Sequence, residues 1–199
     1  MPAPAEPADE DLMHAYAAGD ARAFEQLYDR HATRLWRYIT RSVGEPATSE
    51  ELAQDVWLRV ARDAPGYTPR AAAAGRPPAR FTTWLFTIAH HRIIDHLRAT
   101  RPALSLSAPL GDELTVADTL AAPSGFGPLQ RVQTREQAAQ LLAALDALPA
   151  DQRHAFLLQA EGDLSVAEIA AATGVGLQTA KSRLRYARAA LRRTLEQIA

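Results

Sequence analysis

The sequence predicts an all-α protein made of two small helical units that a proline-rich linker joins. Apolar residues recur at the spacing of amphipathic helices along most of the chain, and no strand-like alternation interrupts them. Residues 102–130 contain four prolines and three glycines without a regular period, which is typical of a semi-extended, flexible linker. We therefore expect a disordered tail over residues 1–8, a first unit over 9–101 and a second unit over 131–199.

The first unit is expected to begin with two helices whose ends are marked by capping and stop signals. A short helix covers about residues 9–18 and ends at Gly19. Asp20 is placed to cap a longer helix, whose apolar residues keep helical spacing until Gly44. His31 lies on the apolar face of this longer helix, where a satisfied core histidine is the favoured interpretation.

A third helix is expected over about residues 49–63, because Thr48 and Glu51 have the spacing of a capping box. Trp57 lies off the apolar stripe of this helix. Such a tryptophan can simply widen the core, or it can belong to a protein-binding patch.

A loop and a long helix complete the first unit. Residues 64–79 contain four prolines and two glycines, and a loop of this length often has a function. Residues 80–101 then read as one helix, with Phe81 and Trp84 on its inward stripe and Pro102 as its stop. Basic residues interleaved with aromatic ones suit single-stranded nucleic acid, although we favour a core position for both aromatics.

The second unit is expected to begin with two helices, over about residues 131–148 and 151–161, and to continue with a short capped helix. Ser165 and Glu168 have the spacing of a capping box, which marks the start of that short helix. Gly174 supplies the left-handed residue with which such a helix usually ends. A longer amphipathic helix follows after a tight turn.

This last helix carries positive charge beside its apolar stripe. Residues 164–199 hold six basic and two acidic residues, and Lys181, Arg185, Arg188 and Arg192 are expected to face outward. A run of charge is usually a solvated helix face. A short helix, a tight turn and a basic helix together are instead the arrangement that places a helix in the major groove, so the sequence predicts DNA binding.

The charge of the chain is unevenly distributed. The net charge is only −1, yet residues 1–30 hold seven acids and two bases, and residues 76–101 hold five arginines and a single acid. The protein therefore has two basic segments within an acidic chain, which suits a nucleic-acid-binding protein. The acidic, proline-rich N-terminus does not resemble a signal peptide and no apolar run approaches the length of a membrane span, so we expect a cytoplasmic protein.

No metal and no other cofactor is expected. The chain has no cysteine, which excludes disulfides and thiolate metal sites. His90, His91, Asp95 and His96 follow one another closely, but three or four convergent ligands are not evident among them.

Three motifs, in the same order, resemble those of extracytoplasmic-function (ECF) sigma factors, which belong to the sigma-70 family of bacterial RNA polymerase subunits. FEQLYDRH followed by SEELAQDVWLRV resembles the start of region 2, and FTTWLFTIAHHRIIDHLR resembles its later helix. LPADQRHAFLLQAEGDLSVAEIAAATGVGLQTAKSRLRYARAALR resembles region 4, the helix-turn-helix. The resemblance covers nearly the whole chain, and three ordered motifs are far more specific than one.

This resemblance implies a protein without enzymatic activity that binds core RNA polymerase, directs it to promoters and helps to melt them. An anti-sigma factor is implied as a further partner. The residues implied to bind the polymerase are Glu51, Gln54, Asp55, Trp57 and Leu58. Those implied at the minus-ten element are Tyr67, Arg80, Thr82, Thr83, Trp84, His91, Asp95 and Arg98. Those implied at the minus-thirty-five element are Thr179, Lys181, Ser182, Arg183, Arg185, Tyr186 and Arg188.

Four features depart from the family pattern. His91 stands where asparagine is usual, Tyr186 where arginine is frequent, and Gln178 where glycine is common. The loop over residues 64–79 is longer than usual because of an AAAAG insert, which predicts altered minus-ten specificity or an ordering event on binding.

Two other classes of function fit the sequence less well. A stand-alone helix-turn-helix regulator would use the second unit for DNA and the first for an effector or for dimerisation, but it would leave the motifs around Gln54 and Trp84 unexplained. An enzyme would need a nucleophile motif, paired carboxylates or a phosphate loop, and the sequence presents none of these.

Overall fold

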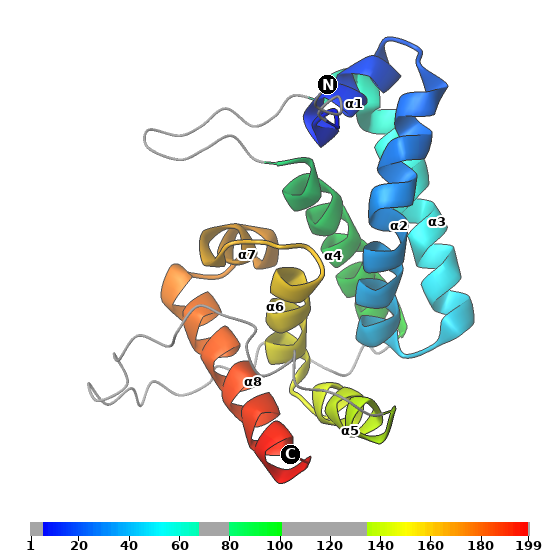
Figure 1. The fold of residues 1–199 in the computed structure, drawn as a ribbon. Coiled ribbons are helices and arrows are strands. Elements are labelled where there is room, and N and C mark those ends of the chain that lie inside the picture. The colour runs from blue at the N-terminus through cyan, green and yellow to red at the C-terminus, as the bar shows by residue number, and fades with distance from the viewer. Residues whose placement is uncertain (1–5, 68–79, 101–134, 199) are drawn as a thin grey trace, which may run out of the picture.

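A computed structural model describes residues 6–67, 80–100 and 135–198, and every regular element in these ranges is a helix (Figure 1). The first unit contains α1 (Asp9–Ala17), α2 (Ala21–Val43), α3 (Pro46–Asp63), the short 3₁₀ helix η1 (Ala64–Gly66) and α4 (Phe81–Thr100). The second unit contains α5 (Arg135–Asp146), α6 (Ala150–Ala160), α7 (Val166–Thr173) and α8 (Leu177–Ile198). The predicted all-α fold is confirmed.

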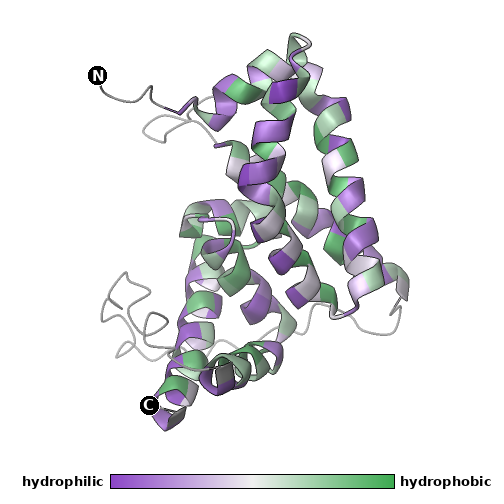
Figure 2. Ribbon diagram, turned by 45° about the vertical axis from the view of Figure 1, so that its right-hand side comes forward, coloured by the Kyte–Doolittle hydropathy of each residue, from purple (hydrophilic) through white to green (hydrophobic). Residues whose placement is uncertain are grey.

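The first unit is built around α2, which packs against α1, α3 and α4. Its core lies between these helices, where Leu27, Leu35 and Ile39 of α2 are fully buried together with Val56 of α3 and Leu85 of α4. Each helix has both hydrophilic and hydrophobic residues around its circumference (Figure 2). Burying these apolar stripes against one another is the main favourable term in forming the unit.

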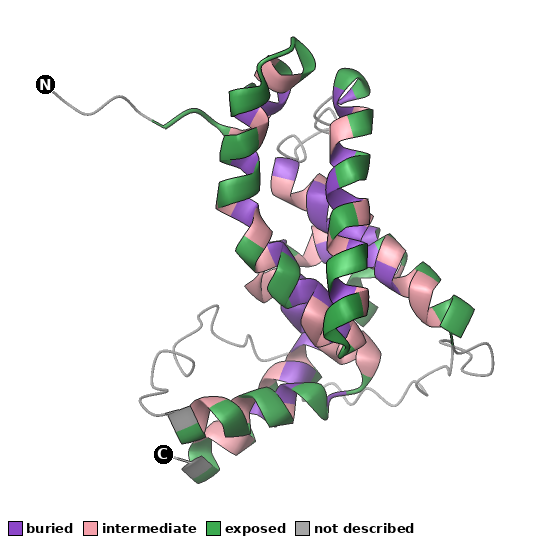
Figure 3. Cartoon of the chain, turned by 90° about the vertical axis from the view of Figure 1, so that its right-hand side faces the viewer, coloured by how far each residue is buried: buried purple, intermediate pink, exposed green. Residues whose placement is uncertain are grey.

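The second unit is built around α8, which packs against α5, α6 and α7. Leu158, Leu164 and Ile169 are buried in this unit together with Ala180 and Leu184 of α8. Buried residues are found where helices meet, and exposed residues cover the outer faces (Figure 3). The described helices do not include one with the length and hydropathy that crossing a membrane requires.

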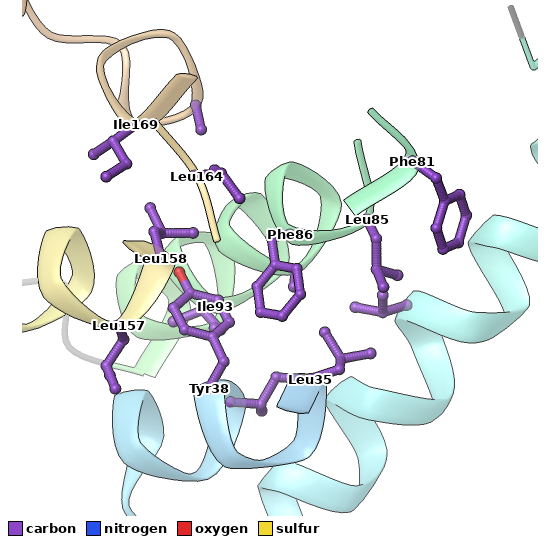
Figure 4. Close-up of a cluster of buried hydrophobic side chains, with 14 of the residues drawn as sticks. Leu35, Tyr38, Phe81, Leu85, Phe86, Ile93, Leu157, Leu158, Leu164 and Ile169 are labelled. Carbon is purple, nitrogen blue, oxygen red and sulfur yellow. The ribbon is translucent and has the colours of Figure 1, made fainter. Parts of the chain in front are cut away.

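The two units pack against each other through α2 and α4 on one side and α6 and α7 on the other. Phe86 of α4 lies against Tyr38 of α2, with ring centroids 5.5 Å apart, and both side chains are fully buried. Leu158 and Leu164 of the second unit lie beside this pair (Figure 4). A continuous apolar cluster therefore connects the units.

Most of the predicted helix ends are found in the structure. Asp20 caps α2 by accepting a hydrogen bond from the backbone N–H of Arg22 at 3.0 Å. Gly44 ends this helix with a left-handed φ of 81°. The expected core position of His31 is also observed, and its Nε2 lies 2.7 Å from Asp9 Oδ2.

The predicted start of the third helix near Ser49 was wrong, because α3 begins at Pro46. Thr48 does not cap the helix, since its hydroxyl donates to the carboxylate of Glu45 at 2.7 Å. Ser49 lies inside the helix and donates to the backbone carbonyl of Glu45 at 2.6 Å. Proline suits the first helical position because its φ is already helical and the missing N–H would have no partner there, so Pro46 decides the start.

Several expectations lie outside the described residues. These are the linker over 102–130, the greater part of the tail over 1–8, the loop insert within 64–79, and the start of the helix expected from 131.

Candidate nucleic-acid interface

The helix-turn-helix consists of α7 and α8, and its local signals act as predicted. The hydroxyl of Ser165 accepts a hydrogen bond from the backbone N–H of Glu168 at 3.3 Å, and the Glu168 carboxylate accepts one from the backbone N–H of Ser165 at 2.8 Å. Gly174 ends α7 with a φ of 68°. After the turn, α8 begins at Leu177.

One face of α8 is open to solvent. Thr179, Lys181 and Tyr186 are exposed there, and Ser182 and Arg185 are half-buried. The guanidinium of Arg185 lies 4.9 Å from the centre of the Tyr186 ring and donates to the Tyr186 hydroxyl at 3.2 Å. An arginine that stacks on an aromatic ring keeps its donors in a defined direction. This face therefore presents ordered cationic and polar groups.

Two arginines of α8 are turned toward α6 instead. Arg183 forms an ion pair with Asp151, and only 18% of its side chain is exposed. Arg188 donates to the side-chain oxygen of Gln159 at 2.5 Å, so the expectation that it faces outward was wrong. Both positions are three or four residues from buried members of the apolar stripe, such as Ala187 and Leu184, which is the sequence signal that would have placed them at its edge.

The N-terminal end of α4 is in contact with the second unit. Arg80 donates to the Asp163 carboxylate at 2.9 Å and also to the Asp163 backbone carbonyl. Thr83 donates to the carboxylate of Glu168 at 2.5 Å. Two of the residues expected at the minus-ten element thus have acidic partners in this structure, which the sequence did not indicate.

Aromatic side chains line the base of the loop before α4. Tyr67 is buried, with its ring centre 5.0 Å from that of Trp84 and 6.3 Å from that of Phe81. Burial raises the pKa of the Tyr67 hydroxyl to about 12, and the carboxylates of Glu10 and Asp9 add to this rise. Trp84 is half-buried, so the core interpretation of these aromatics holds for Phe81 and in part for Trp84.

Farther along α4, His91, Asp95 and Arg98 are all exposed. Their spacing of four and three residues places them on one face of the helix. Thr82 is half-buried, and its hydroxyl oxygen has no hydrogen-bond partner among the described residues. The residues expected at the minus-ten element therefore divide into an exposed strip on α4 and a second group around its N-terminus. In that group Tyr67 is buried, the residues from Thr82 to Trp84 are half-buried, and Arg80 is exposed but ion-paired.

The polar face of α3 is exposed as expected, but two of its residues have structural partners. Glu51, Gln54 and Leu58 are open to solvent, and 68% of Leu58 is exposed. Asp55 forms an ion pair with Arg92 of α4. Trp57 is only 8% exposed, so of its two interpretations the structure supports the one in which it widens the core.

The neighbours of Trp57 lie on α2. The ring of Trp57 has its centre 5.7 Å from that of Phe24 and 5.0 Å from that of Tyr28. Tyr28 and Trp36 are each close to half exposed on this helix, at 47% and 46%. Both are therefore aromatic side chains at the surface of α2, and no sequence motif singled them out as binding residues. Their separation by eight residues, a little over two helical turns, is the signal that would have placed them toward the same side of the helix.

Opposite charges meet across the boundary between the two units. The guanidinium of Arg37 on α2 binds the Glu161 carboxylate through two nitrogens, at 2.9 and 3.1 Å. Arg41 on the same helix lies 3.3 Å from the carboxylate of Asp146. Together with Arg80, these bases belong to the first unit and their acidic partners belong to the second.

Two histidines meet at the same boundary. His90 of α4 and His154 of α6 have ring centres 5.5 Å apart at an interplanar angle of 81°, and Nδ1 of His90 lies 2.9 Å from the Tyr38 hydroxyl. Burial lowers the pKa of His90 to about 4 and that of His154 to about 3, and neighbouring cationic groups act in the same direction. Both imidazoles are therefore neutral near neutral pH. Within the described ranges, no group of three or more histidine and carboxylate side chains is arranged to hold a metal ion.

Comparison with known protein families matches both units. Residues 27–102 match Sigma-70 region 2, and residues 138–191 match Sigma-70, region 4. The ECF RNA polymerase sigma factor SigK of Mycolicibacterium vanbaalenii is 33% identical over 184 residues, which cover 92% of this chain and 87% of the relative. This chain belongs to the ECF sigma factor family. The first unit of this sigma factor is region 2, and the second is region 4.

Other similarities agree with this assignment. The ECF sigma factor SigL of Mycobacterium tuberculosis is 32% identical over 182 residues, covering 92% of this sigma factor and 94% of SigL. The structure of CnrH in complex with the cytosolic domain of CnrY matches with a TM-score of 0.61 and 25% identity, over 97% of this chain and all of that one, 100%. The sigma factor RpoE of Bartonella quintana, solved with the anti-sigma factor NepR, has the same fold, with a TM-score of 0.61 and 22% identity over 88% of this chain and 98% of RpoE.

The family assignment decides between the classes of function. A stand-alone regulator would have an unrelated first unit, whereas residues 27–102 of this chain match region 2. The protein is therefore an RNA polymerase sigma factor of the ECF type.

Proposed function

We propose that this sigma factor binds core RNA polymerase, directs it to promoters and helps to separate the strands, with region 2 at the minus-ten element and region 4 at the minus-thirty-five element. The observation that carries this proposal is the open cationic face of α8 within a capped helix-turn-helix. Such a protein acts by binding, without a reaction or cofactor of its own, and works in the cytoplasm beside the polymerase. We propose residues 9–101 and 131–199 as its two domains, and the family matches to residues 27–102 and 138–191 support the division into two units.

At the minus-thirty-five element, we assign direct DNA contacts to Thr179, Lys181, Ser182, Arg185 and Tyr186. These residues lie on the open or half-open face of α8. Hydrogen bonds and apolar contacts to base edges would specify the sequence, while contacts to phosphates would position the helix.

Arg183 and Arg188 are proposed to act differently from the other residues of α8. Their guanidinium groups donate hydrogen bonds to the side chains of Asp151 and Gln159 of α6. They would hold the recognition helix in place, and any phosphate contact that they make would come at the edge of the groove.

At the minus-ten element, we assign strand contacts to His91, Asp95 and Arg98 on the exposed strip of α4. A base that is read outside the stack needs hydrogen-bonding groups and an aromatic surface close together. Trp84 offers that surface, and Tyr67 supports it from within the fold. Arg80, Thr82 and Thr83 would complete the site at the start of α4.

For core polymerase, we assign the exposed residues Glu51, Gln54 and Leu58 as direct contacts. Asp55 and Trp57 would hold α3 in the required position through Arg92 and the apolar core. We also infer an anti-sigma factor as a partner, as the family resemblance implies.

Run-off transcription with purified core polymerase and a pool of promoter fragments tests the proposed function. The double variant Lys181→Ala/Arg185→Ala should bind core polymerase normally and lose most promoter-dependent transcripts. Arg192→Ala/Arg193→Ala removes the same charge from exposed positions farther along α8 and serves as the matched control, which should keep the selection of the wild type. Failure of the wild-type protein to bind core polymerase would reject the proposal.

A further inference from the structure

One line of residues on α8 points away from the core of region 4, and Arg185 belongs to it. The core side of the helix consists of Ala180, Leu184, Ala187 and Leu191. The opposite line, about half a helical turn away, consists of Gln178, Ser182, Arg185 and Ala189. Gln178 and Ala189 are exposed at its two ends. This line is therefore the part of α8 that a major groove would meet first.

The side chain of Arg185 is held by its neighbour Tyr186. The guanidinium carbon lies 4.9 Å from the centre of the Tyr186 ring, and Nη2 donates to the Tyr186 hydroxyl at 3.2 Å. Consecutive residues of a helix do not normally face each other, so the long side chain of Arg185 has to lie across the helix surface to make these contacts. Because an arginine loses much rotamer freedom when it binds, a contact that is formed beforehand removes part of that cost.

The other basic residues in this part of α8 are arranged differently. Residues 177–190 contain three arginines, and two of them, Arg183 and Arg188, donate to side chains of α6. Lys181 is exposed, but its ammonium group is a point charge without the planar fork of a guanidinium. Within residues 177–190, Arg185 is therefore the guanidinium that belongs to the outward line.

We propose that Arg185 and Tyr186 act as one unit that reads a guanine of the minus-thirty-five element, with Arg185 donating to O6 and N7 of the base and Tyr186 holding the guanidinium in position. This inference rests on the proposed function, which places α8 in the major groove. Guanine presents two acceptors on its major-groove edge, and a guanidinium offers two parallel donors that match them. Only one of the five N–H donors of a guanidinium is needed for the Tyr186 hydroxyl.

Tyr186 is a positioning residue in this unit, because its effect on the guanine passes through Arg185. A tyrosine that read a base by itself would set the preference at a base pair of its own. A tyrosine that holds Arg185 changes the preference only at the base pair that Arg185 reads. The two roles therefore differ in which base pair responds to a change at Tyr186, and not merely in how strongly the protein binds.

The first measurement offers the full chain, bound to core polymerase, a pool of promoter fragments in which the minus-thirty-five segment is randomised. Fragments in heparin-resistant complexes are recovered and sequenced. The wild type should favour guanine at one base pair by about tenfold over the other bases. Arg185→Ala should lose this preference and keep those at other base pairs, and Arg185→Lys, which lacks the parallel donors, should lose most of it. Arg192→Ala removes an exposed arginine farther along α8 and is the matched control, which should keep the preference.

Variants of Tyr186 in the same selection test the positioning role. Tyr186→Ala should weaken the guanine preference by about threefold, and Tyr186→Phe, which keeps the ring, should retain most of it. The double variant Arg185→Ala/Tyr186→Ala should lose no more at this base pair than Arg185→Ala alone, because the tyrosine has no other route to the base. A loss at a different base pair in Tyr186→Ala, or losses that multiply in the double variant, would overturn the proposal.

The second measurement replaces the selected guanine by 7-deazaguanine, which keeps O6 and base pairing but has carbon in place of N7. The wild-type holoenzyme should bind this fragment about tenfold more weakly than the guanine fragment. Arg185→Ala should bind both fragments equally. Equal binding of the two by the wild type would overturn the proposal. A holoenzyme that selects a minus-thirty-five sequence without a guanine that depends on Arg185 would reject this inference alone, whereas one that selects no base there would reject the proposed function as well.

Discussion

Acid should weaken the contact between regions 2 and 4, because His90 and His154 are buried there in their neutral forms. The pKa of His90 lies at about 4 and that of His154 at about 3, below the ordinary value of 6.5. The unfolded chain therefore takes up protons before the folded one does. The stability that depends on these groups is fully present above pH 6.5 and is lost as the pH falls toward the folded pKa values.

The size of this loss of stability follows from the difference between the pH and the pKa of histidine in the unfolded chain. At about pH 5, each imidazole contributes roughly 2 kcal/mol less to the free energy of unfolding than it does near neutral pH. The pair should therefore lower the free energy of unfolding by about 4 kcal/mol. His91 and Arg183 contribute positive charge near His90, and Arg153 and Arg183 do so near His154. Asp9 and Glu168 have pKa values below their ordinary range, so their contributions are lost only under more acidic conditions.

His154→Phe is the informative variant, since phenylalanine keeps an aromatic ring and cannot titrate. Nε2 of His154 is buried without a hydrogen-bond partner among the described residues, so the variant should be more stable by about 1 kcal/mol near neutral pH. Between about pH 7.5 and pH 5 it should lose about 2 kcal/mol instead of about 4.

Urea unfolding followed by far-ultraviolet circular dichroism at several pH values measures both effects. His14→Gln removes an exposed imidazole from α1 that is not among the groups acting on His90 or His154, and it should keep the pH dependence of the wild type. If the wild type and His154→Phe lose the same free energy on acidification, protonation of His154 is not the cause of the loss.

Three further predictions concern stability, and urea unfolding checks each of them. Trp57→Ala should cost about 3 kcal/mol because the side chain is buried, whereas Leu58→Ala, in an exposed position, should cost less than about 0.5 kcal/mol and weaken only the binding of core polymerase. Asp151→Ala should cost about 1–3 kcal/mol because it leaves the partly buried Arg183 without its carboxylate. Ser165→Ala should cost about 1 kcal/mol through the loss of the α7 cap.

Each of these predictions has an outcome that contradicts it. Equal losses in the Trp57 and Leu58 variants would mean that burial does not distinguish the two positions. Asp146→Ala removes an exposed partner of Arg41 and should be nearly neutral, so a loss matching that of Asp151→Ala would count against a special role for the α6 contact. An unchanged stability of Ser165→Ala would show that the Glu168 side chain alone suffices to cap the helix.

Local signals predicted the helices well because each depends on residues only a few positions apart. Asp20, Ser165 and Gly174 act in the structure as their spacing indicated. The error at the start of α3 has the same origin. Two local signals competed there, and the preference of Pro46 for the first helical position prevailed over the capping-box spacing of Thr48.

The direction of long charged side chains was less predictable. Arg183 and Arg185 are both basic residues of α8, yet the first is turned to α6 and the second lies against Tyr186 on the open face. The position of Asp151 relative to α8 depends on how α6 packs against α8. The sequence of α8 alone carries no information about this packing. The same reason explains why the ion pair between Asp55 and Arg92 was not foreseen.

The sequence by itself determined the helices, most of their ends and the membership of the ECF sigma factor family, because these depend on local spacing and on motif order. Only the tertiary structure decided which of the expected DNA-binding residues are open. Arg80 and Thr83 meet Asp163 and Glu168 across 83 and 85 residues of chain. Such pairing is a property of how two helical units pack, and no pattern within either unit specifies it.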